Sequence, residues 1–216
     1  MLSAILVAAG LALCAGAALA QQADAANPAR QGRTFYVSKL GNNSDGSSWA
    51  NAFTTIQAAL DAVPDDRGGH RILVRPDTYF EAVLFPAQRG AEGSYNELVG
   101  DMDGSLGSGT TGWVIVDSGD PEQRGFKSYD WWGPIRATSQ GWSPAHTDAT
   151  FSALCWDRWM LKNLYVTGGD GGLFFDLTDQ VKPFTVIVED CVSIGRAFGG
   201  GVASCLSRPD EPIPYR

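Results

Sequence analysis

The feature that most constrains the fold is a set of short, continuous apolar runs, each ending in a Gly- or Asp-rich corner. Strands that are apolar on both sides are typical of parallel sheets whose two faces are both buried. No amphipathic stretch of helix length separates the runs, so a βαβ winding fits them poorly. The runs are "RILVRPDTYFEAVLF" (71–85), "GWVIVDSG" (112–119), "RWMLKNLYVTGGDGG" (158–172) and "FTVIVEDCVSIGRAFGGG" (184–201).

The spacing of the later runs indicates a repeat. Asn163 and Asp190 occupy similar places in their runs and are 27 positions apart, a period within the range of solenoid proteins. The pattern predicts a parallel β-helix, in which each strand pairs with its equivalent one turn away. Asn163 is then expected at a corner, where its amide can hydrogen-bond along the stack. The longer intervals between the first three runs predict loops over 86–111 and 119–150.

The N-terminal part of the mature chain has a different pattern. "TFYVS" (34–38) predicts a strand, and the turn-rich "KLGNNSDGSS" follows it. Apolar residues at helical spacing then predict an amphipathic helix of roughly ten residues between Ala52 and Val63. Ser47 or Ser48 is the expected N-cap, and Pro64 follows the helix end.

Residues 34–82 carry a family likeness. "TFYVSKLGNNSDGSSWANAFTTIQAALDAV", followed by "RILVRPDTYFE", resembles the N-terminal module of bacterial right-handed parallel β-helix proteins of the pectin-lyase-like superfamily. The matching residues are Asp45, Gly46, Trp49, Thr55 through Leu60, Pro76, Tyr79 and Glu81. Asp77 stands where that family usually has Gly.

The resemblance implies an all-β fold: a right-handed parallel β-helix (solenoid) whose N-terminal capping helix lies across the open end. One domain is expected over 34–216, with the cap at 34–70 and irregular coils with long loops at 71–216. "SCLSRPDEPIPYR" offers no evident C-terminal cap, so we expect the solenoid to be incomplete at its C-terminus.

The same resemblance implies an exported protein that binds or degrades polysaccharide, as a lyase or a glycoside hydrolase. No residue is assigned a catalytic role, because His70 and His146 lie in unrelated surroundings and no Gly-His-Gly occurs. The alternative is a non-enzymatic cell-surface or extracellular module that serves a structural or binding role.

One aromatic stretch is a candidate substrate-binding site. In "YDWWGPIR" (129–136), Tyr129, Trp131, Trp132 and Arg136 could form a platform on which sugar rings stack. The alternative, which we favour on sequence grounds, is that these rings anchor a long loop onto the coil.

One acidic loop is a candidate metal site. "GDMDGSLGSG" (100–109) offers the carboxylates of Asp101 and Asp103, oxygen ligands of the kind that Ca²⁺ prefers. The EF-hand pattern fails, because Leu106 stands where Gly is needed and Gly112 where Glu is needed. A plain turn is the favoured alternative.

The first 20 residues predict export. Residues 1–20 are apolar and end in Ala-Leu-Ala, as signal peptides do, and the polar residues 21–33 read as a flexible leader. A secreted, periplasmic or cell-surface location is expected, with no membrane partner after cleavage. The net charge of −8 gives no electrostatic case for binding nucleic acid. The three remaining cysteines show no metal-ligand spacing, and we expect Cys191 to serve as a small buried hydrophobe.

Overall fold

The described residues of the computed structural model form short strands and one helix. They comprise 32–81, 84–119, 135–138, 156–168, 171–176, 185–195 and 198–203. The elements are β1 (Thr34–Val37), α2 (Ile56–Asp61), β2 (Arg71–Val74), β3 (Asp77–Tyr79), β4 (Asn96–Gly100), β5 (Val114–Asp117), β6 (Ile135–Thr138), β7 (Trp159–Lys162), β8 (Leu164–Thr167), β9 (Gly171–Asp176), β10 (Val186–Glu189), β11 (Val192–Ile194) and β12 (Phe198–Ala203).

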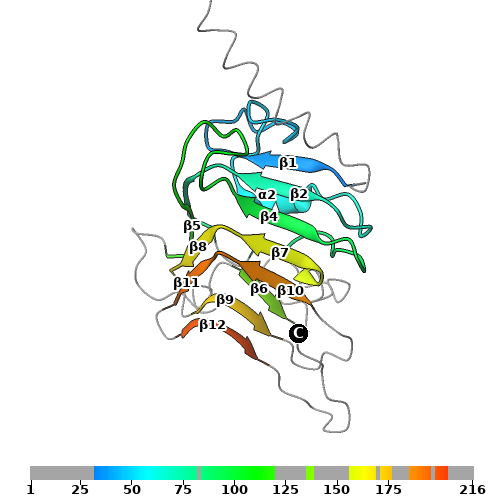
Figure 1. Ribbon diagram of the computed structural model, residues 1–216, viewed down its shortest axis with the longest axis vertical. Helices are drawn as coiled ribbons and strands as arrows, with labels where there is room; N and C mark the ends of the chain where they lie inside the picture. The colour runs from blue at the N-terminus through cyan, green and yellow to red at the C-terminus, as the bar shows by residue number, and fades with distance from the viewer. Residues whose placement is uncertain are drawn as a thin grey trace, which may run out of the picture.

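The strands form three sheets, and every pairing between them is parallel. Sheet A has the order β1-β2-β4-β7-β10, sheet B the order β11-β8-β5-β3, and sheet C the order β12-β9-β6. The chain visits sheets A, B and C in turn from β7 to β9 and again from β10 to β12, and the strands stack along the long axis of the molecule (Figure 1). The prediction of an all-β chain with short strands in parallel sheets is confirmed.

The register of sheet A explains the buried core. Ile72 pairs with Leu98, and Leu98 pairs with Leu161, so one apolar column points into the interior along the stack. All three side chains are fully buried. Sheet B contributes Val114 and Leu164 to the same core. Each strand of sheet A therefore buries its inward side chains against those of the neighbouring strands.

The outer face of sheet A is also covered near β1. The outward side chains Tyr36, Leu73 and Val99 form a second cluster, against which Trp49 and Leu106 pack from two loops. The rings of Tyr36 and Trp49 meet edge to face at 4.9 Å, and Trp49 Nε1 donates to the carbonyl oxygen of Leu106 at 3.2 Å. Burial on both faces is the physical reason why these strands read as continuous apolar runs.

The loop after β1 covers the outer edge of that strand. Tyr36 N–H donates to Gly46 O at 2.9 Å, and Phe53 N–H donates to Tyr36 O at 2.9 Å. Ser38 N–H donates to Phe53 O at 2.8 Å. These bonds occupy backbone groups that would otherwise present a free strand edge.

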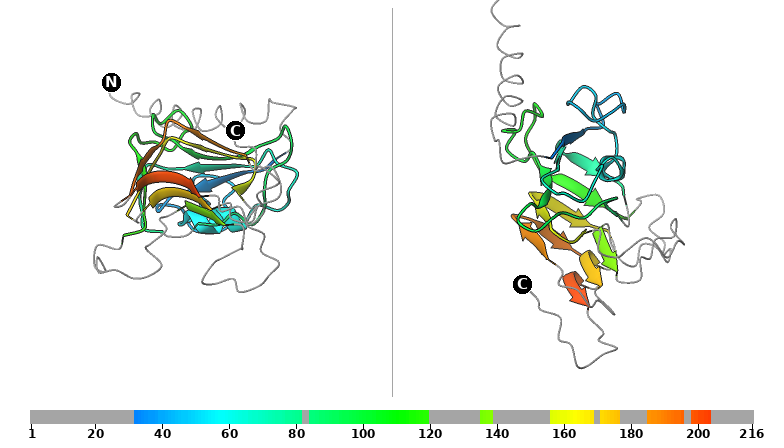
Figure 2. Two further views of the ribbon diagram at one scale, coloured as in Figure 1. Left: turned by 90° about the horizontal axis from the view of Figure 1, so that it is seen from below. Right: turned by 90° about the vertical axis from the view of Figure 1, so that its right-hand side faces the viewer.

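The helix forms where it was expected but begins later. Its N-cap is Thr55, whose side chain accepts from Ala58 N, so the predicted caps at Ser47 and Ser48 are wrong. Residues 47–53 lie in the loop instead, because Trp49 packs on the outer face of sheet A and Phe53 pairs with β1. The apolar residues of α2 join the main core beside β1 and β2. In both views of Figure 2 the helix lies in line with the stack of sheet C.

Candidate functional site

Three of the four residues predicted to bind substrate, Tyr129, Trp131 and Trp132, lie outside the described residues. The fourth, Arg136, lies in β6 opposite Phe174 of β9, and only its backbone is described. The loop platform at residues 129–136 therefore stays a prediction.

The two candidate metal ligands are engaged with the backbone of their own loop. Asp101 is buried, and its two carboxylate oxygens accept from Leu106 N at 2.9 Å and Ser108 N at 2.8 Å. Asp103 accepts from Ser105 N at 3.0 Å, and hydrogen bonds from Ser105 lower the pKa of Asp103. Within the described residues, no group of three or more His, Cys, Asp or Glu side chains could hold a metal ion. The Ca²⁺ site at Asp101 and Asp103 stays a prediction.

The half-buried Glu81 and the buried Asp157 also have structural partners. Glu81 accepts from Ile56 N at 2.7 Å and Gln57 N at 2.9 Å, at the start of α2. Asp157 accepts from Thr185 N at 2.9 Å and from the guanidinium of Arg158 at 2.7 Å. These carboxylates hold the backbone in place, and none of them has a second carboxylate as a partner in these bonds.

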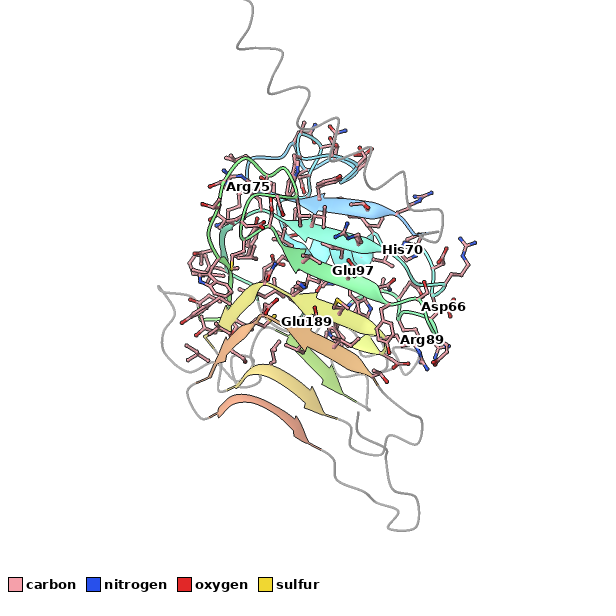
Figure 3. All side chains as sticks on the ribbon, in the orientation of Figure 1. Asp66, His70, Arg75, Arg89, Glu97 and Glu189 are labelled. Atoms are coloured by element: carbon pink, nitrogen blue, oxygen red, sulfur yellow. The ribbon has the colours of Figure 1, made fainter. Side chains whose placement is uncertain are left out.

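The buried His70 is held at both ring nitrogens. Its Nδ1 accepts from Arg33 N at 3.0 Å, and its Nε2 lies 3.1 Å from an oxygen of Asp65. The first contact assigns the neutral ring with the proton on Nε2. Hydrogen bonds, first from Arg67 and then from His70, lower the pKa of Asp65. Figure 3 shows His70 at the end of β2 opposite Arg75, far along the strand from sheet B. The ring thus holds the backbone at Arg33, the residue before β1.

The outer face of sheet B presents exposed aromatic and aliphatic side chains. Because neighbours along a strand alternate between faces, Trp113 and Ile115 point outward while Val114 and Val116 are buried. Tyr165 lies beside Ile115 on the next strand, and its ring meets that of Trp113 edge to face at 6.2 Å. We call this outward surface the sheet-B face. It comprises Thr78, Phe80, Trp113, Ile115, Asp117, Tyr165, Thr167, Val192 and Ile194.

Three side chains of the sheet-B face are strongly exposed. Phe80 is 53% exposed, Trp113 38% and Ile194 46%. Exposed large apolar side chains gathered on one face mark an interaction surface more often than scattered ones do. Hydroxyl and carboxylate groups of Thr78, Thr167 and Asp117 lie on the same face. The surface thus combines flat apolar rings with hydrogen-bonding groups.

A charged pair borders the face at β3. Lys39 Nζ lies 3.3 Å from a carboxylate oxygen of Asp77 and 5.8 Å from the centre of the Phe80 ring. The same ammonium lies 5.6 Å from the ring of Tyr79, which is buried. The Asp at position 77 therefore anchors the lysine that packs on these two rings.

Strand alternation in the sequence indicates part of this face. Trp113 and Tyr165 each stand one residue before a buried valine or leucine position in a parallel strand, so strand alternation alone turns them outward. Their proximity, however, depends on the pairing of β5 with β8 across 50 residues of sequence, and no local pattern gives that register.

Comparisons with known proteins assign neither a family nor a function to the chain. The chain matches no model of a known protein family, and searches of curated proteins and of solved structures find no match either. In the part of the chain that the structure describes, no helix has the length and apolar character needed to cross a membrane.

Proposed function

We propose that this chain is an exported, right-handed parallel β-helix protein that binds polysaccharide through the sheet-B face. The observation that carries the proposal is the pair of outward rings, Trp113 and Tyr165, on a rigid parallel sheet. Aromatic rings offer large flat apolar area at low cost in side-chain entropy, which suits the apolar faces of sugar rings.

The β-helix assignment is supported by the path of the chain and by its corners. Asn163 joins β7 to β8, and Asp190 is the first of two residues that join β10 to β11; both have positive φ, at 57° and 51°. Asn163 and Asp190 hold equivalent places in neighbouring strands, because the residues on either side of them pair: Glu189 with Lys162, and Val192 with Tyr165. The loop 38–53 and α2 would act together as the N-terminal cap, the loop on the edge of β1 and the helix on the flank of the core.

Export is supported by the composition of residues 1–20, which lie outside the described part of the chain. A secreted, periplasmic or cell-surface protein would meet polysaccharides of the cell wall or matrix. The acidic surface is compatible with such a soluble, exported protein.

Binding without catalysis is the version that the described side chains favour. The carboxylates of Glu81, Asp101 and Asp157 accept backbone N–H groups, a structural use. A lyase or glycoside hydrolase remains the second version of the proposal, because the family likeness of residues 34–82 supports it.

The test measures binding of the secreted protein to a panel of soluble polysaccharides, by affinity electrophoresis and by quenching of tryptophan fluorescence. We expect Trp113→Ala and Tyr165→Ala each to weaken binding about tenfold, equivalent to roughly 1.4 kcal/mol. Ile187→Ala is the matched control, because Ile187 points outward from sheet A instead.

Unchanged binding by both aromatic variants would overturn the sheet-B assignment. Binding to none of the panel by the folded protein would overturn the proposed function. Release of reducing or unsaturated sugars, measured with and without a chelator, would replace the binding version with the enzymatic one.

A further inference from the structure

The charges around the sheet-B face point to the class of its ligand. Asp117 lies on the face itself, where its carboxylate accepts from Gly119 N at 2.8 Å. Asp190 lies at the corner that leads into β11, and its side chain is 70% exposed. Glu189 lies beside it, at the end of sheet A that adjoins sheet B (Figure 3).

Two lysines that border this face, Lys39 and Lys162, are paired with carboxylates, and Arg75, between β2 and β3, donates to the carbonyl oxygen of Ser108 at 3.3 Å. Lys39 Nζ lies 3.3 Å from Asp77, as described above. Lys162 Nζ lies 3.0 Å from Glu189 and 3.8 Å from Asp190. The hydrogen bond and charge of Glu189 raise the pKa of Lys162, so its positive charge is retained and directed at these acids.

A polyanionic chain would meet an unfavourable potential here. Its carboxylates or sulfates would approach Asp117 and Asp190, and the bordering lysines would have to exchange partners to bind it. The net charge of −8 adds a long-range repulsion of the same sign. A neutral sugar chain avoids both costs and can still use the hydroxyl and carboxylate groups of the face as hydrogen-bond partners.

We infer that the sheet-B face takes a neutral glycan and discriminates against polyuronates and sulfated polysaccharides. This inference rests on the proposed function, because it names the ligand class of the same surface. The exposed ring of Trp113 supplies the stacking contact, and the acidic border of Asp117 and Asp190 supplies the discrimination.

The test compares two neutral polymers, hydroxyethylcellulose and dextran, with two polyuronates, polygalacturonate and alginate. Binding is measured by affinity electrophoresis at about 0.02 M and about 0.5 M salt, where charge screening is weak and strong. We expect at least one neutral polymer to bind with little salt dependence and to lose about tenfold in affinity with Trp113→Ala. We expect the polyuronates to bind at least roughly tenfold more weakly at the lower salt.

A charge-neutralising variant makes the test specific. The variant Asp190→Asn lies outside the sheet-B face, at the corner before β11, and keeps a residue type that tolerates positive φ. It should leave neutral binding within about twofold and raise polyuronate binding several-fold at low salt.

The outcomes separate the inference from the function on which it rests. A polyuronate that binds as tightly as the neutral polymers, and loses affinity with Trp113→Ala, would overturn the neutral-glycan inference and support the polysaccharide-binding function. Failure of all four polymers to bind in a Trp113-dependent way would overturn the function of the sheet-B face, and the inference with it.

Discussion

The side-chain amide of Asn163 donates a hydrogen bond to the carbonyl oxygen of Gly100, 3.2 Å away at the end of β4. Asn163 is the single residue between β7 and β8, and its φ of 57° turns the chain from sheet A to sheet B. Asn adopts this left-handed conformation more readily than most residues with a side chain. The predicted role of Asn163 at a corner is thereby confirmed.

This corner gives a prediction with two variants. Asn163→Gly keeps the favourable φ and loses the amide bond, so the free energy of unfolding should fall by about 1 kcal/mol. Asn163→Ala loses the bond and adds strain at positive φ, so the free energy of unfolding should fall by roughly a further 1 kcal/mol. Chemical denaturation followed by circular dichroism measures both values. Equal losses for the two variants would contradict the argument from strain.

The pKa of Glu81 predicts a pH dependence of stability. Burial raises this pKa above its ordinary value of 4.5, and the amides of Gln57 and Ile56 offset part of the rise. The folded state therefore holds the proton more tightly than the unfolded state. The contribution of Glu81 to the free energy of unfolding is greatest below the ordinary pKa, and stability should decrease as pH rises through the raised pKa.

Glu81→Ala tests both roles of this carboxylate. We expect the variant to lose the pH dependence in that window and to unfold more easily by about 1–3 kcal/mol, because two helix amides lose their acceptor. Asp66→Asn is the control, since its carboxylate is 57% exposed and its ion pair with Arg89 is long, at 3.8 Å. If the two variants had the same pH profile, Glu81 would not be the source of it.

Helix α2 should be essential for the fold. Leu60 is fully buried against the main core, so Leu60→Ala should lower the free energy of unfolding by about 2–5 kcal/mol. Asp61→Ala, on the exposed side of the same helix, should cost only about 0.5 kcal/mol. Thermal melts of the two proteins compare them directly. A Leu60 variant as stable as the Asp61 variant would refute the packing role of the helix.

Cys191 should react slowly with alkylating reagents. Burial is the main cause that raises the pKa of its thiol, and the charge of Asp190 acts in the same direction. Its Sγ also lies 3.1 Å from the carbonyl oxygen of Glu189. Because the thiolate is the reactive form, iodoacetamide at about pH 8 should label Cys191 several-fold more slowly than a free peptide thiol. Peptide-resolved mass spectrometry gives the rate, and a rate equal to that of the peptide would contradict the prediction.

The sequence by itself determined the class of fold. Continuous apolar runs such as "RILV" and "VIVE" need partners on both faces, and the absence of crossover helices favoured parallel sheets of short strands as the arrangement that supplies them. The apolar spacing between Ala52 and Val63 indicated the helix. Both inferences rest on periodicity and on residue types that act locally.

The tertiary structure decided what those residues do. Trp49 packs on the outer face of sheet A, where its indole donates to the carbonyl oxygen of Leu106, 57 positions away in the sequence. The carboxylate of Glu81 accepts from the first two amides of α2, and that of Asp101 accepts from two amides of its own loop. The meeting of Trp113 with Tyr165 likewise depends on strand register. Such contacts join residues far apart in sequence, and only the packing of the whole chain brings their atoms within reach.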